Sequence, residues 1–420
     1  MYEVFARTKS VCPVCLRTID AEKAVAGDGF VHLIKTCPEH GFFDTMIWEG
    51  SADEYLAWGG ACPGGEADDG CPNNCGLCAE HRSEGCCVLL ELTRRCNLRC
   101  PVCFASAGGE GDLGLDEIAR LYDMLMARGG PFNIQLSGGE PTMRDDLPEI
   151  VRLGKELGVA HLQVNTNGIR IAQDIEYLRA LRDAGLDLIY LQFDGLDDSI
   201  YRTVRGRDML DIKLKAIENC EKLGVGILLV PVVIPGVNLH RLGEIVRFAK
   251  GHIPTIKGIH FQPVSYFGRF PGQTPPDESR CGLSDVIHAL CEQCPDELKL
   301  EHFVPRKQFD PHCDFSSTYY LDENGALVAM SKFSQNDADT EKTDFVEKTN
   351  KYTVKRWKFQ QDRPADTPLM RFAMRTLTHS FCISGMGFQD VWNIDLGRLH
   401  GCCVHMITGE GEIVPFCAFH

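Results

Sequence analysis

The sequence predicts an α/β protein whose central part is a partial (β/α)6 barrel with cysteine-rich metal-binding regions at its N-terminal and C-terminal sides. Three observations support this fold class. Short β-prone apolar runs alternate with amphipathic stretches in the middle of the chain. Six such strands are too few for the usual closed barrel of eight. Most of the 21 cysteines lie outside this alternating part.

The alternating elements come in a regular order along the chain. The expected strands are Val88–Leu92, Asn133–Leu136, His161–Val164, Leu188–Phe193, Gly226–Val233 and Gly258–Gln262. The expected helices between them are Asp116–Ala127, Asp145–Leu157, Asp174–Ala184, Leu210–Leu223 and Leu239–Lys250. A strand followed by a helix, repeated, implies right-handed crossovers and a parallel sheet. We expect a mononuclear metal ribbon over 1–50, a cysteine-rich cluster segment over 51–87, the partial barrel over 88–270 and a C-terminal region over 271–420 that binds a further cluster and covers the substrate.

Composition narrows the class of protein. The formal net charge of −16 would repel a phosphate backbone, which argues against nucleic acid as the main partner. No apolar run approaches the ~20 residues that a membrane span needs, and the first ten residues are too polar for a signal peptide. We therefore expect a cytoplasmic protein, held at a membrane surface if its substrate is a lipid. In a reducing compartment, cysteines on this scale most often bind metals.

The first predicted strand runs into a loop with three closely spaced cysteines, in the segment TRRCNLRCPVCF. Cys96, Cys100 and Cys103 would supply three thiolates to a four-iron cluster and leave one iron open for a substrate. A zinc knuckle is the alternative for this spacing. The position of the loop, directly after the first strand of a βα series, favours the cluster.

The next strand ends in the turn SGGEP, which contains Gly138, Gly139 and Glu140. Two glycines allow the backbone to approach a ligand closely, and a carboxylate can bind an ammonium group. A tight βα turn without a ligand is the alternative. The combination of this turn with the cysteine loop favours a ligand site.

These two motifs together resemble the radical SAM superfamily, and the resemblance covers about residues 86–270. It implies that Cys96, Cys100 and Cys103 bind a [4Fe–4S] cluster and that the turn Gly138 to Glu140 binds the amino group of S-adenosylmethionine. The implied reaction is reductive cleavage to methionine and a 5′-deoxyadenosyl radical, which abstracts hydrogen from an unactivated C–H bond. A reductant such as flavodoxin or ferredoxin would supply the electron.

The resemblance extends to later strand ends. It implies that Asn165 and Asn167 lie near the nucleoside, that Gln192 lies at the ribose position and that Arg205 binds the methionine carboxylate, a task suited to a planar bidentate donor. One position departs from the family pattern. The residue before the last cluster cysteine is commonly aromatic and near the adenine, whereas here it is Val102.

The other cysteines form separate groups. Two knuckles, CPVC and CPEH, predict a closed mononuclear zinc or iron site with the ligands Cys12, Cys15, Cys37 and His40, against the alternative of unliganded thiols. One or two auxiliary [4Fe–4S] clusters are expected, the first bound by Cys71, Cys75 and Cys78 with Cys62, Cys86 or Cys87 as a fourth ligand, and the second by Cys281, Cys291, Cys294 and Cys313. Scattered structural thiols are the alternative for the second group. The sequence does not assign Cys382, Cys402, Cys403 and Cys417.

The layout of these motifs over the whole chain, including the final VPFCA, resembles the tetraether lipid synthase-like branch of the superfamily. That resemblance implies several iron–sulfur clusters and C–C bond formation on a lipid-like substrate. The alternatives are a peptide maturase and a radical methyltransferase. From a different class comes a non-enzymatic iron–sulfur electron carrier, which would have no need of Glu140 and Arg205.

Overall fold

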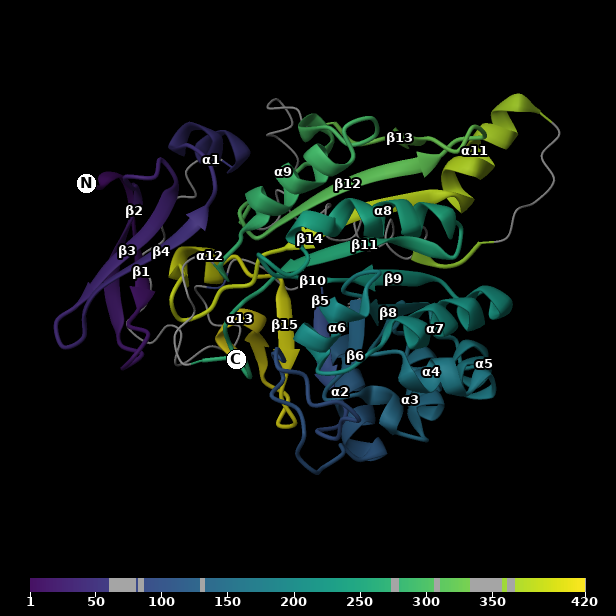
Figure 1. Cartoon of the computed structure of the whole chain (residues 1–420). Helices are drawn as coiled ribbons and strands as arrows, with labels where there is room; N and C mark the ends of the chain where they lie inside the picture. Colours follow the sequence, from purple (N-terminus) through teal and green to yellow (C-terminus); the bar gives the residue numbers. More distant parts are fainter. Residues whose placement is uncertain are drawn as a thin grey trace.

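A computed structural model describes residues 1–59, 81, 87–128, 133–272, 279–305, 310–332, 357–360 and 367–419. Two sheets organise these residues, a four-stranded antiparallel sheet near the N-terminus and a larger twelve-stranded mixed sheet (Figure 1). No helix in these ranges combines the length and the hydropathy of a membrane span.

The predicted partial barrel is confirmed. Its strands are parallel, and in the sheet they follow one another in chain order, as right-handed βα units require. The strands are β5 (Cys87–Glu91), β6 (Asn133–Ser137), β7 (His161–Thr166), β8 (Leu188–Gln192), β9 (Ile227–Val230) and β11 (Ile256–Pro263). The predicted helices are α2 (Leu115–Ala127), α3 (Leu147–Glu156), α5 (Ile175–Asp183), α7 (Leu210–Leu223) and α8 (Leu242–Gly251). The sequence did not predict the shorter helices α4 (Ile169–Gln173) and α6 (Asp198–Arg205).

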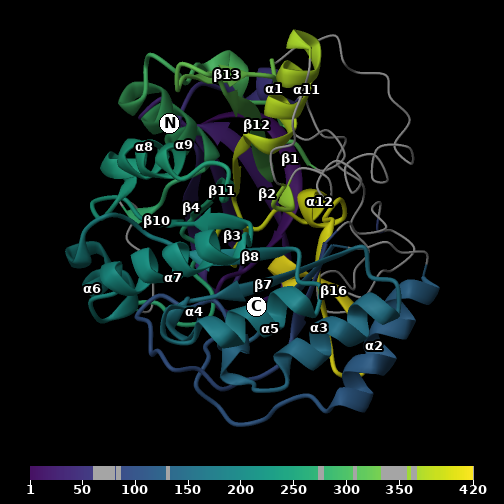
Figure 2. The same ribbon diagram turned by 90° about the vertical axis from the view of Figure 1, so that its right-hand side faces the viewer.

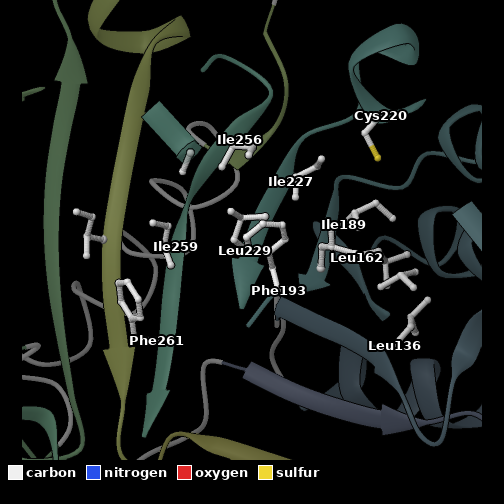
Figure 3. Packing of buried hydrophobic residues seen from close by; sticks show 14 of the residues in the cluster. Leu136, Leu162, Ile189, Phe193, Cys220, Ile227, Leu229, Ile256, Ile259 and Phe261 are labelled. Carbon is white, nitrogen blue, oxygen red and sulfur yellow. The ribbon is translucent and has the colours of Figure 1, made fainter. Parts of the chain in front are cut away.

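Strand alternation divides the barrel into an outer core and an inner wall. Leu136, Leu162, Ile189 and Leu229 are fully buried and pack with helix residues in one apolar cluster (Figure 3). Figure 2 shows helices on this side, with α3 and α5 below strands β7 and β8 and α7 beside them. Because successive side chains of a strand point to opposite faces, the residues between these positions face the inside of the barrel. Those inner residues line the cavity described below.

C-terminal strands extend the barrel at both edges. Strand β14 (Ser380–Met386) pairs in parallel with β11, and β12 (Asp314–Leu321) and β13 (Leu327–Ala329) follow it outward. At the other edge β15 (Val404–Ile407) pairs in parallel with β5 and carries β16 (Ile413–Pro415) (Figure 1). The described strands after residue 310 are therefore part of the same sheet as the barrel.

The N-terminal sheet is a ribbon of four antiparallel strands followed by helix α1 (Ala52–Gly59). Its strands are β1 (Glu3–Val11), β2 (Thr18–Val25), β3 (Val31–Cys37) and β4 (Gly41–Trp48). The ribbon is tied to the C-terminal region by buried polar contacts: Asp395 accepts a hydrogen bond from Thr8 at 2.6 Å and pairs with Lys23 at 2.7 Å. In addition, the ring of Tyr55 stacks on His312 with centroids 3.7 Å apart.

Candidate active site and metal sites

A cavity of about 310 Å³ lies inside the barrel and is lined by residues from its strand ends and from the C-terminal strands. All the residues that the sequence predicts for the cluster and for S-adenosylmethionine line this one cavity: Cys96, Cys100, Cys103, Gly138, Gly139, Glu140, Asn165, Asn167, Gln192 and Arg205. The structure thus brings them together, and their individual roles remain predictions.

The cysteine loop is fixed at both ends. Its start is tied to Asp112, which accepts hydrogen bonds from Thr93 at 2.5 Å and from Arg95 at 2.6 Å. Its end pairs with Arg269 through reciprocal backbone hydrogen bonds between Cys103 and Arg269 of 2.8 Å each. Burial raises the pKa of Cys96 to about 11. Thiolates at such a site need a cation for charge balance, which bound iron would provide.

The glycine turn packs against the backbone of this loop. A Cβ on Gly138 would lie 2.3 Å from the carbonyl oxygen of Thr93, and one on Gly139 would lie 2.3 Å from that of Arg95. The amide of Gly139 also donates to the Thr93 carbonyl at 2.7 Å. The two glycines are therefore required for close approach to the cluster loop itself, a reason that the sequence alone did not indicate.

Glu140 links the ends of β6 and β7. One carboxylate oxygen accepts hydrogen bonds from Thr142 and from the Thr166 hydroxyl, the latter at 2.7 Å, and the other accepts one from the Asn167 amide at 2.7 Å. Burial raises the pKa of Glu140, and these hydrogen bonds oppose that shift. The oxygen with a single donor keeps accepting capacity for an ammonium group.

Arg205 and Asp194 form a buried bidentate ion pair at the end of β8. The Nε and Nη2 atoms of Arg205 each donate to Asp194 at 2.7 Å, and Nη1 donates to the amide oxygen of Gln192 at 2.8 Å in the orientation that satisfies both groups. Burial lowers the pKa of Arg205, but the ion pair outweighs it and keeps the guanidinium charged. After the donors to Asp194 and Gln192 are counted, one of the five N–H groups of Arg205, on Nη1, remains to bind a carboxylate.

Lys213 is a buried polar residue of this site that sequence reasoning missed. Its ammonium donates to the Asn167 carbonyl at 2.6 Å, and burial lowers its pKa to about 7. Lys213 lies on the same buried stripe of α7 as Ala216, Ile217 and Cys220. The sequence does contain a signal for Lys213, because it stands at a position of α7 where the helical repeat predicts an apolar residue.

The ribbon brings its four predicted ligands together. The ligand atoms of Cys12, Cys15, Cys37 and His40 all lie within 4.8 Å of one another. The sulfurs of Cys15 and Cys37 are 4.0 Å apart, and Nδ1 of His40 lies 3.4 Å from Cys37 Sγ. Such separations suit a tetrahedral ion with metal–sulfur bonds of about 2.3 Å.

Comparison with known proteins identifies the family. A model of the radical SAM superfamily matches residues 90–249. The chain is 33% identical over 474 aligned residues to "7,8-dihydro-6-hydroxymethylpterin dimethyltransferase" of Methanocaldococcus jannaschii, covering 99% of this chain and 93% of that protein. This chain belongs to the radical SAM superfamily. It is a radical SAM enzyme, as the sequence predicted.

Other matches are more local. A model described as the HMPTM N-terminal zinc ribbon domain matches residues 4–49 of this radical SAM enzyme. A probable GTP 3′,8-cyclase of Sulfolobus acidocaldarius is 32% identical over 221 residues, which is 52% of this chain and 67% of that protein. The solved structure of Streptococcus suis SuiB bound to precursor peptide SuiA matches with a TM-score of 0.43 at 18% identity, covering 50% of this chain and 46% of SuiB.

The four cysteines predicted to bind the second auxiliary cluster do not lie together, so this predicted ligand set is wrong. Cys281 lies just before helix α9 (Leu283–Gln293), whereas Cys291 and Cys294 lie at its far end. Eleven helical residues span about 16 Å, which is too far for one four-iron cluster. The sulfur of Cys281 contacts the Val233 carbonyl at 3.5 Å. The other predicted set, Cys71, Cys75 and Cys78 with Cys62 or Cys86, lies outside the described residues; Cys87 lies at the start of β5.

Cys313 instead lies with two cysteines that the sequence left unassigned. Burial raises the pKa of Cys402, and neighbouring Cys417 and Cys313 raise it further. Arg398 donates to the sulfur of Cys313 at 3.3 Å, and the Gln389 amide donates to that of Cys417 at 3.3 Å. The thiols of these three half-buried residues are therefore neighbours of one another and of the guanidinium of Arg398.

The C-terminal strands complete the cavity of this radical SAM enzyme. Cys382 and Ser384 of β14 line it, and Ser384 bonds to Nδ1 of His260 on β11 at 2.9 Å. Sequence reasoning missed these residues because β14 follows β11 by more than a hundred residues in the chain and no local pattern reports their pairing.

Proposed function

We propose that this radical SAM enzyme is a methyltransferase that modifies a small, uncharged, pterin-like heterocycle. The relationship to the Methanocaldococcus jannaschii dimethyltransferase over nearly the whole of both chains carries the proposal. The methyltransferase was an alternative in the sequence analysis, and the comparisons favour it over a lipid or peptide substrate.

The residues of the cavity take the following roles in the proposal. Cys96, Cys100 and Cys103 hold a [4Fe–4S] cluster, which when bound supplies the electron that cleaves S-adenosylmethionine to a 5′-deoxyadenosyl radical. Glu140 accepts the ammonium of the methionine part, and the guanidinium of Arg205 binds its carboxylate.

In this proposal, the nucleoside of S-adenosylmethionine binds to one part of the cavity wall. Asn165, Asn167 and Gln192 lie along it. The buried surroundings exclude water from the radical. The electron would come from a flavodoxin or ferredoxin.

The polar side chains of the cavity argue against a lipid chain as the substrate. Amide and hydroxyl side chains of several strands line it, including Asn133, Gln135, Gln163 and Thr318, which would leave polar groups unpaired against an alkyl chain. Among the described lining residues, Glu140 and Arg205 supply the only carboxylate and guanidinium, and no lysine lines it. A triphosphate such as that of GTP would therefore find no dedicated cation.

Anaerobic turnover tests the proposal. The reconstituted enzyme, given dithionite, S-adenosylmethionine and 7,8-dihydro-6-hydroxymethylpterin, is expected to form 5′-deoxyadenosine together with a methylated pterin, both detected by liquid chromatography and mass spectrometry. S-adenosylmethionine labelled in its methyl group identifies the source of the added carbon. Formation of 5′-deoxyadenosine with no pterin product at any pterin concentration would overturn the substrate assignment.

Two further metal sites belong to the proposal. The ribbon ligands Cys12, Cys15, Cys37 and His40 bind one zinc or iron ion in a closed structural site, as their mutual distances support. Cys313, Cys402 and Cys417 supply three thiolates to an auxiliary cluster beside Arg398, whose charge would offset theirs.

The auxiliary thiols are linked to the cluster loop by aromatic packing. The ring of Phe416, next to Cys417, lies 5.6 Å from that of Phe104, next to Cys103.

The metal content of single variants separates these sites. A Cys37→Ala variant is expected to lose one metal ion per chain without loss of sulfide, because the ribbon site contains no inorganic sulfide. A Cys417→Ala variant is expected to lose both iron and sulfide. Cys291→Ala is the matched control, since that thiol lies at the end of α9 away from either group, and it should keep the wild-type metal content. Unchanged metal in either of the first two variants, measured by plasma emission and sulfide assay, contradicts the corresponding site.

A further inference from the structure

A row of three amide side chains crosses the inner wall of the barrel. Gln163 Nε2 donates to Asn165 Oδ1 at 3.3 Å, and Asn165 Nδ2 donates to Gln135 Oε1 at 2.9 Å. Gln135 Nε2 lies in turn 3.1 Å from the sulfur of Cys87. Gln135 and Gln163 are register partners on the adjacent strands β6 and β7, and all of these residues line the cavity. We call Gln135, Gln163 and Asn165 the amide row.

The amide row has hydrogen-bonding capacity beyond its own contacts. Each primary amide carries two N–H groups and two carbonyl lone pairs, and the row uses one N–H of each member. The orientation of all three amides is fixed by the row, so donors and acceptors come in a defined order. Gln163 and Asn165 lie two residues apart on β7, and Gln135 lies opposite Gln163 on β6, so the row presents amides from two adjacent strands, which lie about 4.8 Å apart.

Charge in the cavity limits the ligand further. Glu140 is engaged by Thr142, Thr166 and Asn167, and Arg205 by Asp194 and Gln192. The described wall around the amide row carries amides and hydroxyls without a lysine or a further carboxylate. A ligand that binds here therefore gains from neutral hydrogen bonds, and phosphate or carboxylate groups on it would be desolvated without a partner.

The wall beyond the amide row offers flat surfaces. Tyr190 on β8 and His260 on β11 line the same cavity, with ring centroids 5.8 Å apart. The hydrogen bond of 2.9 Å between His260 Nδ1 and Ser384 holds the imidazole in one orientation. An aromatic ligand can pack against these rings while its edge meets the amides.

We propose that the amide row is the specificity element of the substrate site: Gln135 and Gln163 bind the hydrogen-bonding edge of a neutral, planar nitrogen heterocycle, with Tyr190 and His260 against its face. This inference rests on the proposed function and adds to it the residues that recognise the ring. It assigns Gln135 and Gln163 to the substrate, and Asn165, which hydrogen-bonds to both, connects them to the part of the wall proposed for the nucleoside.

The test uses two variants in the reconstituted enzyme, Gln163→Met and Gln135→Met, which keep the side-chain length and remove the amide. Binding of 7,8-dihydro-6-hydroxymethylpterin is measured by anaerobic fluorescence titration in the presence of S-adenosylmethionine. Each variant is expected to raise the dissociation constant about tenfold or more, because a net hydrogen bond is lost and its partner is left unpaired.

Controls separate the possible outcomes. Gln173→Met makes the same change at an exposed glutamine at the end of α4 and should bind the pterin as the wild type does. Gln135→Asn and Gln163→Glu serve where a methionine variant fails to fold, as judged by its melting temperature and iron content. Wild-type affinity in folded amide-row variants overturns this inference while the proposed function stands. A wild-type enzyme that cleaves S-adenosylmethionine but neither binds nor methylates the pterin overturns the proposed substrate, and the inference with it.

Discussion

A Cys100→Ala variant is expected to form no 5′-deoxyadenosine above the uncatalysed background, the largest effect that the site predicts. Cys100 is buried between Cys96 and Cys103 on a loop fixed at both ends by Asp112 and Arg269. No neighbouring thiol can replace it without moving that loop. With two thiolates left, the four-iron cluster would lose the ligand set that leaves a single iron open.

The measurement is single-turnover product analysis with dithionite, together with iron and sulfide content. Cys291→Ala again serves as the control, because it removes a partly exposed thiol outside the cavity. Retention of 5′-deoxyadenosine formation in Cys100→Ala would contradict the assignment of the cluster to this loop. The Cys417→Ala variant is measured in parallel, so that a general loss of iron–sulfur clusters can be distinguished from loss of the cluster on the Cys96–Cys103 loop.

An Asp194→Ala variant is expected to lose about 3–5 kcal/mol of the free energy of unfolding, since it leaves the buried Arg205 charge without its partner. Asp194 also accepts a hydrogen bond from the Val232 amide at 3.1 Å, so the change disturbs the start of β10 (Val232–Val233) as well. The affinity for S-adenosylmethionine should also fall, because Arg205 loses the ion pair that orients its guanidinium toward the methionine carboxylate.

Urea unfolding followed by circular dichroism measures the stability, and isothermal titration measures the affinity. Asp194→Asn is the matched control: it keeps the volume and one acceptor and should lose less stability than the alanine variant. A loss below about 1 kcal/mol in Asp194→Ala would mean that the pair is solvated, contrary to its burial.

Local patterns in the sequence predicted much of this molecule. The parallel strands of the barrel are short apolar runs in the sequence. The residues that follow them, such as Glu140 and Asn167, meet at one edge because parallel strands share a carboxyl end. The ribbon ligands were equally predictable, because two short knuckles on a hairpin fix their own geometry.

The remaining parts depend on contacts between distant segments. Cys313 was grouped with Cys281 because both lie in one stretch of sequence, but helix α9 separates Cys281 from Cys294, and Cys313 packs instead near the end of the chain. The amide row could not be predicted from the sequence for a related reason. Gln135 and Gln163 are ordinary polar residues in the sequence, and only the pairing of their strands shows that they face one cavity.

The pairing of β15 with β5 has a consequence for biosynthesis. The first barrel strand emerges from the ribosome early, yet its outer edge stays open until Val404–Ile407 has been made. Unpaired strand edges promote association between nascent chains. The sheet of the barrel, and with it the surroundings of the cluster loop, is therefore complete only after Val404–Ile407 has been made, more than three hundred residues after β5.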